Sequence, residues 1–182
     1  MQLSFKANTY IYLTVLLFLI PFPWLLSWLI AIVFHEFCHW MAVRAFGGSV
    51  YQLEIGIGGA TMQCSNMNDR SRLFSILCGP FGGGLLVIFS RWMPRIAICS
   101  LFLSIYNLIP ILPLDGGNAL YIILKRKNVF YYTQKFVLLF LSFVAMYCGI
   151  FLNLGVLPIA IIASLWIKNL KTPCKEGICL VQ

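Results

Sequence analysis

Residues 24–45 read WLLSWLIAIVFHEFCHWMAVRA, an apolar stretch that carries two histidines and a glutamate near its middle. An uninterrupted apolar run of about 20 residues is long enough to cross a bilayer as a helix. Ionisable side chains inside such a helix are costly unless they are paired or bind a metal, and they usually mark a functional site. The stretch therefore predicts a membrane helix that holds a polar cluster.

The composition extends this membrane interpretation to the whole chain. Of its 182 residues, 61% are hydrophobic and 10% are charged, and the mean hydropathy is +0.91. Soluble domains are about 45–50% apolar and about 25% charged, so a soluble globular, disordered or compact disulfide-rich protein is excluded. At roughly 20 residues per crossing, residues 1–182 allow about six spans in a single membrane-embedded domain. No room remains for a second globular domain.

Uncharged runs and prolines predict the positions of the helices in an all-α polytopic membrane protein. A core over 24–117 is flanked by peripheral helices at 3–20 and within 129–170. The expected helices lie near 3–20, 24–45, 73–90, 96–109, 129–152 and 154–170, with a short amphipathic piece near 117–126.

The distribution of charge predicts the orientation of these spans. The chain has 13 Lys and Arg against 5 Asp and Glu, for a net charge of +8. With six alternating spans, every basic residue except Arg91 and Arg95 falls on one side. Basic loops stay in the cytoplasm, so we expect a multi-pass protein of a bacterial cell membrane with both termini cytoplasmic. The basic excess then reflects topology, and no nucleic-acid partner is expected.

Residues 51–64 have a different pattern, in which apolar and polar or glycine residues alternate as in a strand. Gly58-Gly59 can turn the chain, and Thr61–Cys64 can return as a second strand. We expect a small membrane-associated β-hairpin between the second and third helices; an ordinary interfacial loop is the alternative.

Both histidines of the chain fall in the pentapeptide His35-Glu36-Phe37-Cys38-His39. Positions i and i+4 share one face of a helix, so both imidazoles can bind one metal ion. Glu36 lies beside them and can accept a proton from water. The alternative is a polar packing cluster between helices.

A zinc site of this kind needs a third protein ligand, and the acidic residues are few. Glu54 is one candidate, in the predicted hairpin. Asp115 is another, and it is flanked by Pro110, Pro113 and the pair Gly116-Gly117. Such interrupted backbone at membrane depth is tolerated where it lines a cavity. Asp115 reaches the histidines only if the segment over 110–113 folds back.

The motif His-Glu-x-x-His at 35–39, with Asn-x-x-Pro-x-x-Pro-Leu-Asp-Gly-Gly at 107–117, resembles the site-2 protease family (M50) of intramembrane zinc metalloproteases. Cys78-Gly79-Pro80 is similar to the Gly-Pro motif of that family. The resemblance covers about 35–117 and implies one Zn²⁺ per chain, bound by His35, His39 and Asp115, with Glu36 as the catalytic base. The layout is most similar to the stage IV sporulation FB branch, without the PDZ or CBS domain of other members.

The chain departs from the family at Gly83, where many members carry Asn. Either Asn107 takes over a catalytic role such as polarising the scissile carbonyl, or that role is absent. Gly79-x-x-x-Gly83 also predicts close helix packing.

The resemblance implies hydrolysis of peptide bonds in or next to transmembrane segments of membrane-anchored proteins or peptides, as in regulated intramembrane proteolysis. A substrate helix must unwind before attack, and the hairpin offers an edge for the unwound strand. Glu54, Gly56 and Gly58 are the substrate-binding candidates there. The alternative function is a non-catalytic zinc-binding membrane scaffold or transporter. Cys174 and Cys179 in the tail are expected to be inert rather than acylated or metal-bound.

Overall fold

The computed structural model describes residues 2–5, 20–56, 59–65, 67–151, 157–171 and 179–181. The chain forms two compact units. The first comprises Met1–Leu108 with Gly177–Gln182, and the second comprises Ile109–Glu176.

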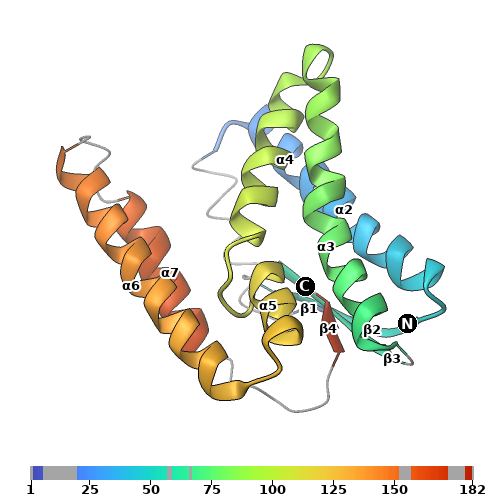
Figure 1. The fold of residues 1–182 in the computed structure, drawn as a ribbon. Coiled ribbons are helices and arrows are strands. Elements are labelled where there is room, and N and C mark those ends of the chain that lie inside the picture. The colour runs from blue at the N-terminus through green and yellow to red at the C-terminus, as the bar shows by residue number, and fades with distance from the viewer. Residues whose placement is uncertain are drawn as a thin grey trace. The chain divides into compact units, whose positions relative to one another are not determined.

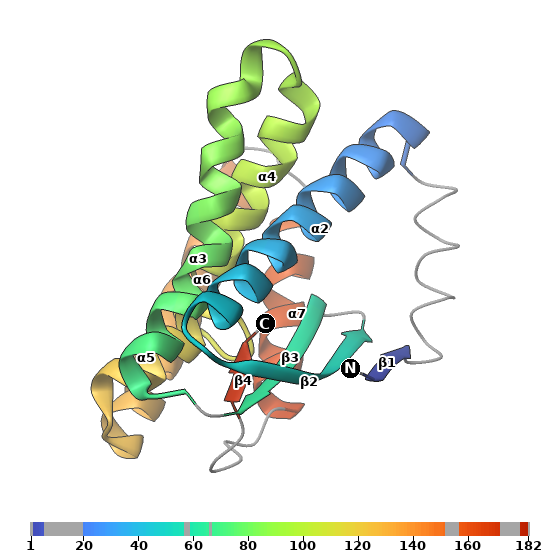
Figure 2. The ribbon, with the colours of Figure 1, turned by 90° about the vertical axis from the view of Figure 1, so that its right-hand side faces the viewer.

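Three helices form the body of the first unit, and each packs against the other two. They are α2 (Phe22–Ala45), α3 (Asp69–Leu85) and α4 (Pro94–Asn107), and a 3₁₀ helix, η1 (Leu86–Arg91), extends α3. Figure 2 shows the three helices with a small sheet at the end where α2 stops and α3 starts. Residues buried among them include Ala31, Val43 and Ile76.

The ends of α2 follow from its flanking residues. Pro23 lies in the first turn, where its missing N–H costs no hydrogen bond. The helix ends before Gly47, whose φ of +76° is a conformation that glycine adopts without strain. The Gly48 N–H then donates to the Val43 carbonyl at 2.9 Å and closes the last turn. The predicted helix over 24–45 is confirmed.

Helix α3 begins four residues before the predicted start at residue 73. The side-chain oxygen of Asn68 accepts a hydrogen bond from the Ser71 N–H at 2.8 Å. This N-cap satisfies one of the free backbone donors of the first turn, and Asp69 adds a negative charge near the positive end of the helix. The helix therefore starts in the polar loop rather than where the uncharged run begins.

A four-stranded sheet completes the first unit, with the strand order β1-β2-β3-β4 (Figure 1). Its strands are β1 (Gln2–Phe5), β2 (Ser49–Gly56), β3 (Gly59–Ser65) and β4 (Cys179–Val181). Strands β2 and β3 pair antiparallel at the position of the predicted hairpin, β1 pairs parallel to β2, and β4 pairs antiparallel to β3.

The prediction of a helix over 3–20 is wrong at its start, because Gln2–Phe5 is a strand. Gln2, Leu3, Ser4 and Phe5 alternate polar and apolar residues, and they lie opposite Gln52, Leu53, Glu54 and Ile55, which alternate in the same way. This alternation was hidden by the long apolar stretch that follows. The remainder of the predicted helix, residues 6–19, lies outside the described residues.

The second unit starts with an irregular segment that leads into α5 (Asp115–Leu124). Helix α5 begins at Asp115, two residues before the amphipathic piece predicted near 117–126. It ends at Leu124, and the next residue, Lys125, caps it with a left-handed φ of 52°. The ring of Tyr121 lies 5.2 Å from that of Phe130 and packs the end of α5 against the next helix.

Helices α6 (Lys127–Phe151) and α7 (Leu157–Lys171) run antiparallel, side by side (Figure 1). The Trp166 indole N–H donates to the Ser142 hydroxyl, and the Asn169 amide donates to the Gln134 carbonyl, each at 3.2 Å. Polar contacts of this kind join helices in lipid, where apolar burial supplies little driving force between them.

Three described helical stretches are long and apolar enough to cross a membrane: Phe22–Ala45, Asp69–Arg91 and Asn128–Phe151. Large apolar side chains on them are highly exposed, such as Phe81 at 67% and Phe136 at 71%. Exposed apolar surface of this kind is expected where a helix faces lipid rather than water. The chain is mostly helical. Six membrane spans were predicted, and these three are the ones found among the described residues.

Candidate metal centre

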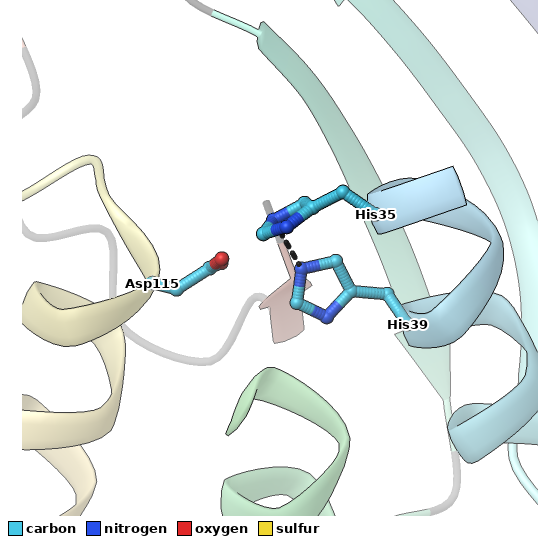
Figure 3. Close-up of side chains that lie close together, drawn as sticks. All are labelled: His35, His39 and Asp115. Carbon is cyan, nitrogen blue, oxygen red and sulfur yellow. Dashed lines mark hydrogen bonds between the residues drawn. The ribbon is translucent and has the colours of Figure 1, made fainter. Parts of the chain in front are cut away.

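His35 and His39 lie one turn apart on α2, and both side chains are buried, with 1% and 0% of their surfaces exposed. Their Nε2 atoms are 3.2 Å apart, as the dashed line in Figure 3 shows. The two rings meet edge to face at an interplanar angle of 85°. The i, i+4 spacing therefore brings both imidazoles to one buried point.

The orientation of His39 is fixed by α3. Its Nδ1 lies 2.8 Å from the backbone oxygen of Ser75, which can only accept a hydrogen bond. Nδ1 therefore carries the proton, and Nε2 keeps its lone pair. A hydrogen bond from the far ring nitrogen is the usual support of a metal-binding histidine.

The spacing of the two Nε2 atoms fits a metal ion. Two nitrogens bound to one tetrahedral zinc at about 2.0–2.1 Å lie about 3.3 Å apart, close to the observed 3.2 Å. Asn107 Nδ2, at the end of α4, lies 3.2 Å from His35 Nε2 and can donate to its lone pair. The separation of the two Nε2 atoms therefore matches that of two imidazoles bound to one zinc ion.

Gly79 on α3 provides the space for the His39 ring. A Cβ at this position would overlap Nε2, Cε1 and Cδ2 of His39. Any side chain at residue 79 would therefore displace His39 Nε2, the nitrogen that faces His35. The requirement for glycine here is steric and follows from direct contact with the imidazole.

Two further glycines of α3, Gly82 and Gly83, lie against different partners. A Cβ at Gly82 would overlap the Cys38 sulfur on α2, whereas a Cβ at Gly83 would overlap the Ser104 hydroxyl on α4. Gly79 and Gly83 therefore do not form a single contact stripe, because they face two different helices.

Gly83 has no room for the Asn that many family members carry. The Ser100 hydroxyl donates to the Gly83 carbonyl at 2.8 Å, and Ser104 is only 4% exposed. Two serines one turn apart on α4 thus occupy the space beside this glycine. Sequence reasoning missed them and Ser75, although small polar residues at helical spacing in an apolar helix were a signal.

Asp115 is the first residue of α5 in the second unit and is fully buried. The preceding segment folds back onto this helix, because a Cβ at Gly117 would overlap the backbone of Ile111 and Leu112. The Leu114 N–H donates to the Ile111 carbonyl at 2.9 Å and tightens the turn. Within this unit the chain therefore turns back just before Asp115, and the prediction that this turn brings Asp115 to the histidines stays a prediction.

The structure brings His35, His39 and Asn107 together. Glu36 lies on α2 next to His35 and is partly exposed. Glu54 and Gly56 lie in β2, opposite Thr61 and Gly59. Two predicted positions, Gly58 of the hairpin and Cys174 of the tail, lie outside the described residues.

Residues 84–149 match the family model of Peptidase family M50, and this stretch contains Asn107 and Asp115. The comparison with curated proteins finds no match. Among solved structures, the fold is similar to that of the Site-2 Protease from Methanocaldococcus jannaschii, with a TM-score of 0.66 and 19% identity. The alignment covers 97% of this chain and 94% of that one.

The family match and the three apolar helices indicate an integral membrane protein. The motifs at 35–39 and 107–117, the family match and the similarity of fold agree with one another. The resemblance of this chain to the site-2 proteases of peptidase family M50 is confirmed.

Proposed function

We propose that the chain is an intramembrane zinc metalloprotease that hydrolyses peptide bonds in or next to transmembrane segments of membrane-anchored substrates. The observation that carries the proposal is the buried imidazole pair on α2, whose Nε2 atoms converge while Ser75 holds His39 in the metal-binding tautomer.

We propose that His35, His39 and Asp115 hold the zinc ion. Each residue offers one ligand atom, and all three side chains are buried. Three protein ligands leave a fourth position open, as in catalytic rather than structural zinc sites. When bound, zinc supplies a Lewis acid that polarises a carbonyl and lowers the pKa of water toward about 7.

Two further side chains have roles in the proposed reaction. Glu36 accepts a proton from the attacking water and passes it to the leaving amine, which is the work of a general base that later acts as an acid. The Asn107 amide nitrogen lies 3.2 Å from His35 Nε2. From this position the amide would donate a hydrogen bond to the scissile carbonyl of the substrate.

The substrate must reach the site as an unwound strand, and β-strand addition to the hairpin is one way to hold it. In the described residues, both edges of the hairpin are already paired, β2 with β1 and β3 with β4. A substrate strand would therefore displace one of these two strands. Both are short, with four and three residues, so few backbone hydrogen bonds oppose their displacement.

We also propose that the protein crosses a bacterial cell membrane six times, with both termini in the cytoplasm and a layout similar to the stage IV sporulation FB branch. The one-sided distribution of Lys and Arg supports this orientation. The substrates would then be cut near the cytoplasmic ends of their spans, where helices α2 and α4 end.

The test is cleavage of a tethered reporter substrate by the wild-type chain and by Glu36→Gln. We expect a loss of about 100-fold or more, because a positioned base contributes roughly 10²–10⁴ in rate. The zinc content should stay at one per chain, since glutamine keeps the shape of the side chain and removes only the base.

Asp69→Asn is the matched control, because it makes the same chemical change on the exposed first turn of α3. It should keep both activity and zinc. Continued turnover by Glu36→Gln at the wild-type rate would refute the assignment, and a metal-free but active wild-type protein would refute the metalloprotease itself.

A further inference from the structure

The turn that joins η1 to α4 lies at the end of these helices that is far from the sheet, as Figure 2 shows. A pocket of about 240 Å³, the turn pocket, lies here within the first unit. It is lined by apolar side chains alone: Leu86, Phe89, Trp92, Met93 and Ile96. Small-molecule sites usually measure about 300–1,000 Å³, so the turn pocket has room for a segment of an apolar chain rather than for a whole ligand.

The 3₁₀ geometry of η1 explains how this lining forms. Side chains three residues apart line up in a 3₁₀ helix, so Leu86, Phe89 and Trp92 share one face. The Trp92 N–H and the Met93 N–H both donate to the Phe89 carbonyl at 3.0 Å, and Pro94 then begins α4. The turn thus brings Ile96, from the first turn of α4, to the same pocket.

The turn pocket lies at the end of a membrane span. Asp69–Arg91 is long and apolar enough to cross a bilayer, and the pocket is at its Arg91 end. Trp92 follows directly and is 72% exposed. Tryptophan concentrates where lipid headgroups meet the acyl chains. The apolar lining is therefore at the depth where an acyl chain begins.

Two arginines flank the turn pocket. Arg91 directly precedes Trp92, Arg95 directly precedes Ile96, and both arginines are exposed. No acidic residue lies between Asp69, at the other end of the span, and Asp115. Arginine binds phosphate through paired hydrogen bonds, and its long side chain reaches from apolar surface to the headgroup level. Two positive charges beside an apolar pocket fit a ligand with an anionic head and an apolar chain.

We propose that this turn binds an anionic phospholipid, with a segment of one acyl chain in the turn pocket and the phosphate at Arg91 and Arg95. Charge complementarity decides the occupant. A zwitterionic lipid offers the same chains, but its headgroup adds a positive charge beside the two arginines. An apolar peptide would fill the pocket and leave both arginines without a negative partner. Lipid binding here does not depend on the proposed protease activity.

The first experiment tests the headgroup. Native mass spectrometry of the purified full chain measures the first bound lipid, with phosphatidylglycerol and phosphatidylcholine of identical acyl chains. We expect a preference of at least about tenfold for phosphatidylglycerol, which the double variant Arg91→Gln/Arg95→Gln loses. The matched control, Arg70→Gln/Arg126→Gln, removes two exposed arginines elsewhere and should keep it. Equal binding of the two lipids by the wild type, or an equal loss in both double variants, would overturn the proposal.

The second experiment tests the acyl chain while both arginines stay in place. Ile96→Trp adds bulk inside the turn pocket and should weaken phosphatidylglycerol binding at least about fivefold. Ile98→Trp makes the same change on α4 at an exposed position outside the lining and should have no effect. Glycerol phosphate, which has the anionic group without the chains, should not displace the lipid. Equal binding by the two tryptophan variants, or displacement by glycerol phosphate, would show that the pocket holds no acyl chain.

Discussion

Gly79 determines whether the Nε2 atom of His39 can face His35, because the His39 imidazole occupies the space that a side chain at residue 79 would fill. The backbone carbonyl of Ser75, one turn earlier on α3, fixes the other ring nitrogen. Helix α3 thus positions the His39 ring in two ways. Gly79 leaves space for the ring, and the Ser75 carbonyl accepts a hydrogen bond from it. Both contacts lie within the first unit and depend on close packing of α2 and α3.

Replacing Gly79 by Ala should lower zinc affinity at least tenfold, because the added methyl group overlaps the His39 ring and moves Nε2. Zinc titration of the purified variant measures this. Gly84→Ala is the matched control, since nothing lies within 4 Å of a Cβ at that position of the same helix. Equal zinc affinity of the two variants would show that α3 does not hold His39.

The convergence of the two histidines could be predicted, because positions i and i+4 lie on one face of a helix. The roles of Glu36 and Asp115 stay predictions from residue type and spacing. The Ser75 contact could not be predicted, because any residue offers the same backbone carbonyl. Ser100 and Ser104 were also missed, because small polar residues in an apolar helix usually serve packing alone. Contacts made by backbone atoms, or by small side chains that fill a narrow space, are therefore difficult to predict from a sequence.

Contacts with the preceding segment, over 111–114, determine where α5 begins in the second unit. Ile111 and Leu114 are fully buried, and the Asn118 amide donates to the Pro113 carbonyl at 3.3 Å. Gly117 lets the first turn of α5 approach the backbone of Ile111. These contacts set the start of the helix at Asp115, where a carboxylate also suits the positive end of the helix dipole.

Gly117→Ala should therefore shift the start of α5 and lower zinc affinity without any change to a proposed ligand. The overlap is with backbone atoms, which cannot rotate away, so we expect a destabilisation of about 1–3 kcal/mol from overpacking. Thermal unfolding in detergent and zinc titration measure the two effects. Asn118→Ala, which removes one long hydrogen bond, should cost at most about 1 kcal/mol. The explanation fails if Gly117→Ala is the milder of the two.

Most of the helices could be predicted from the sequence, because a long uncharged segment in a membrane has few alternatives to a helix. The hairpin could be predicted from its alternation, but β1 and β4 could not. Strands of four and three residues carry too little pattern, and their partners lie far away in the sequence. From the local sequence alone, Gln2–Phe5 was therefore assigned to the same predicted helix as the apolar residues that follow.

The whole chain combines an apolar surface with a few buried polar groups. Exposed side chains such as Trp92 and Phe136 are suited to lipid, whereas the histidines and Asp115 are withdrawn from the surface. The proposed zinc ligands are two imidazoles and one carboxylate, so loss of any one of them should weaken the proposed zinc site as a whole.

The zinc environment of the purified full chain, measured by X-ray absorption at the zinc edge, tests the proposed zinc site most directly. We predict one zinc per chain with two imidazole nitrogens and a carboxylate oxygen at about 2.0–2.2 Å, and at least a tenfold loss of zinc affinity in Asp115→Asn. An unchanged spectrum and affinity in Asp115→Asn, or a first shell without two imidazoles, would contradict the proposed site.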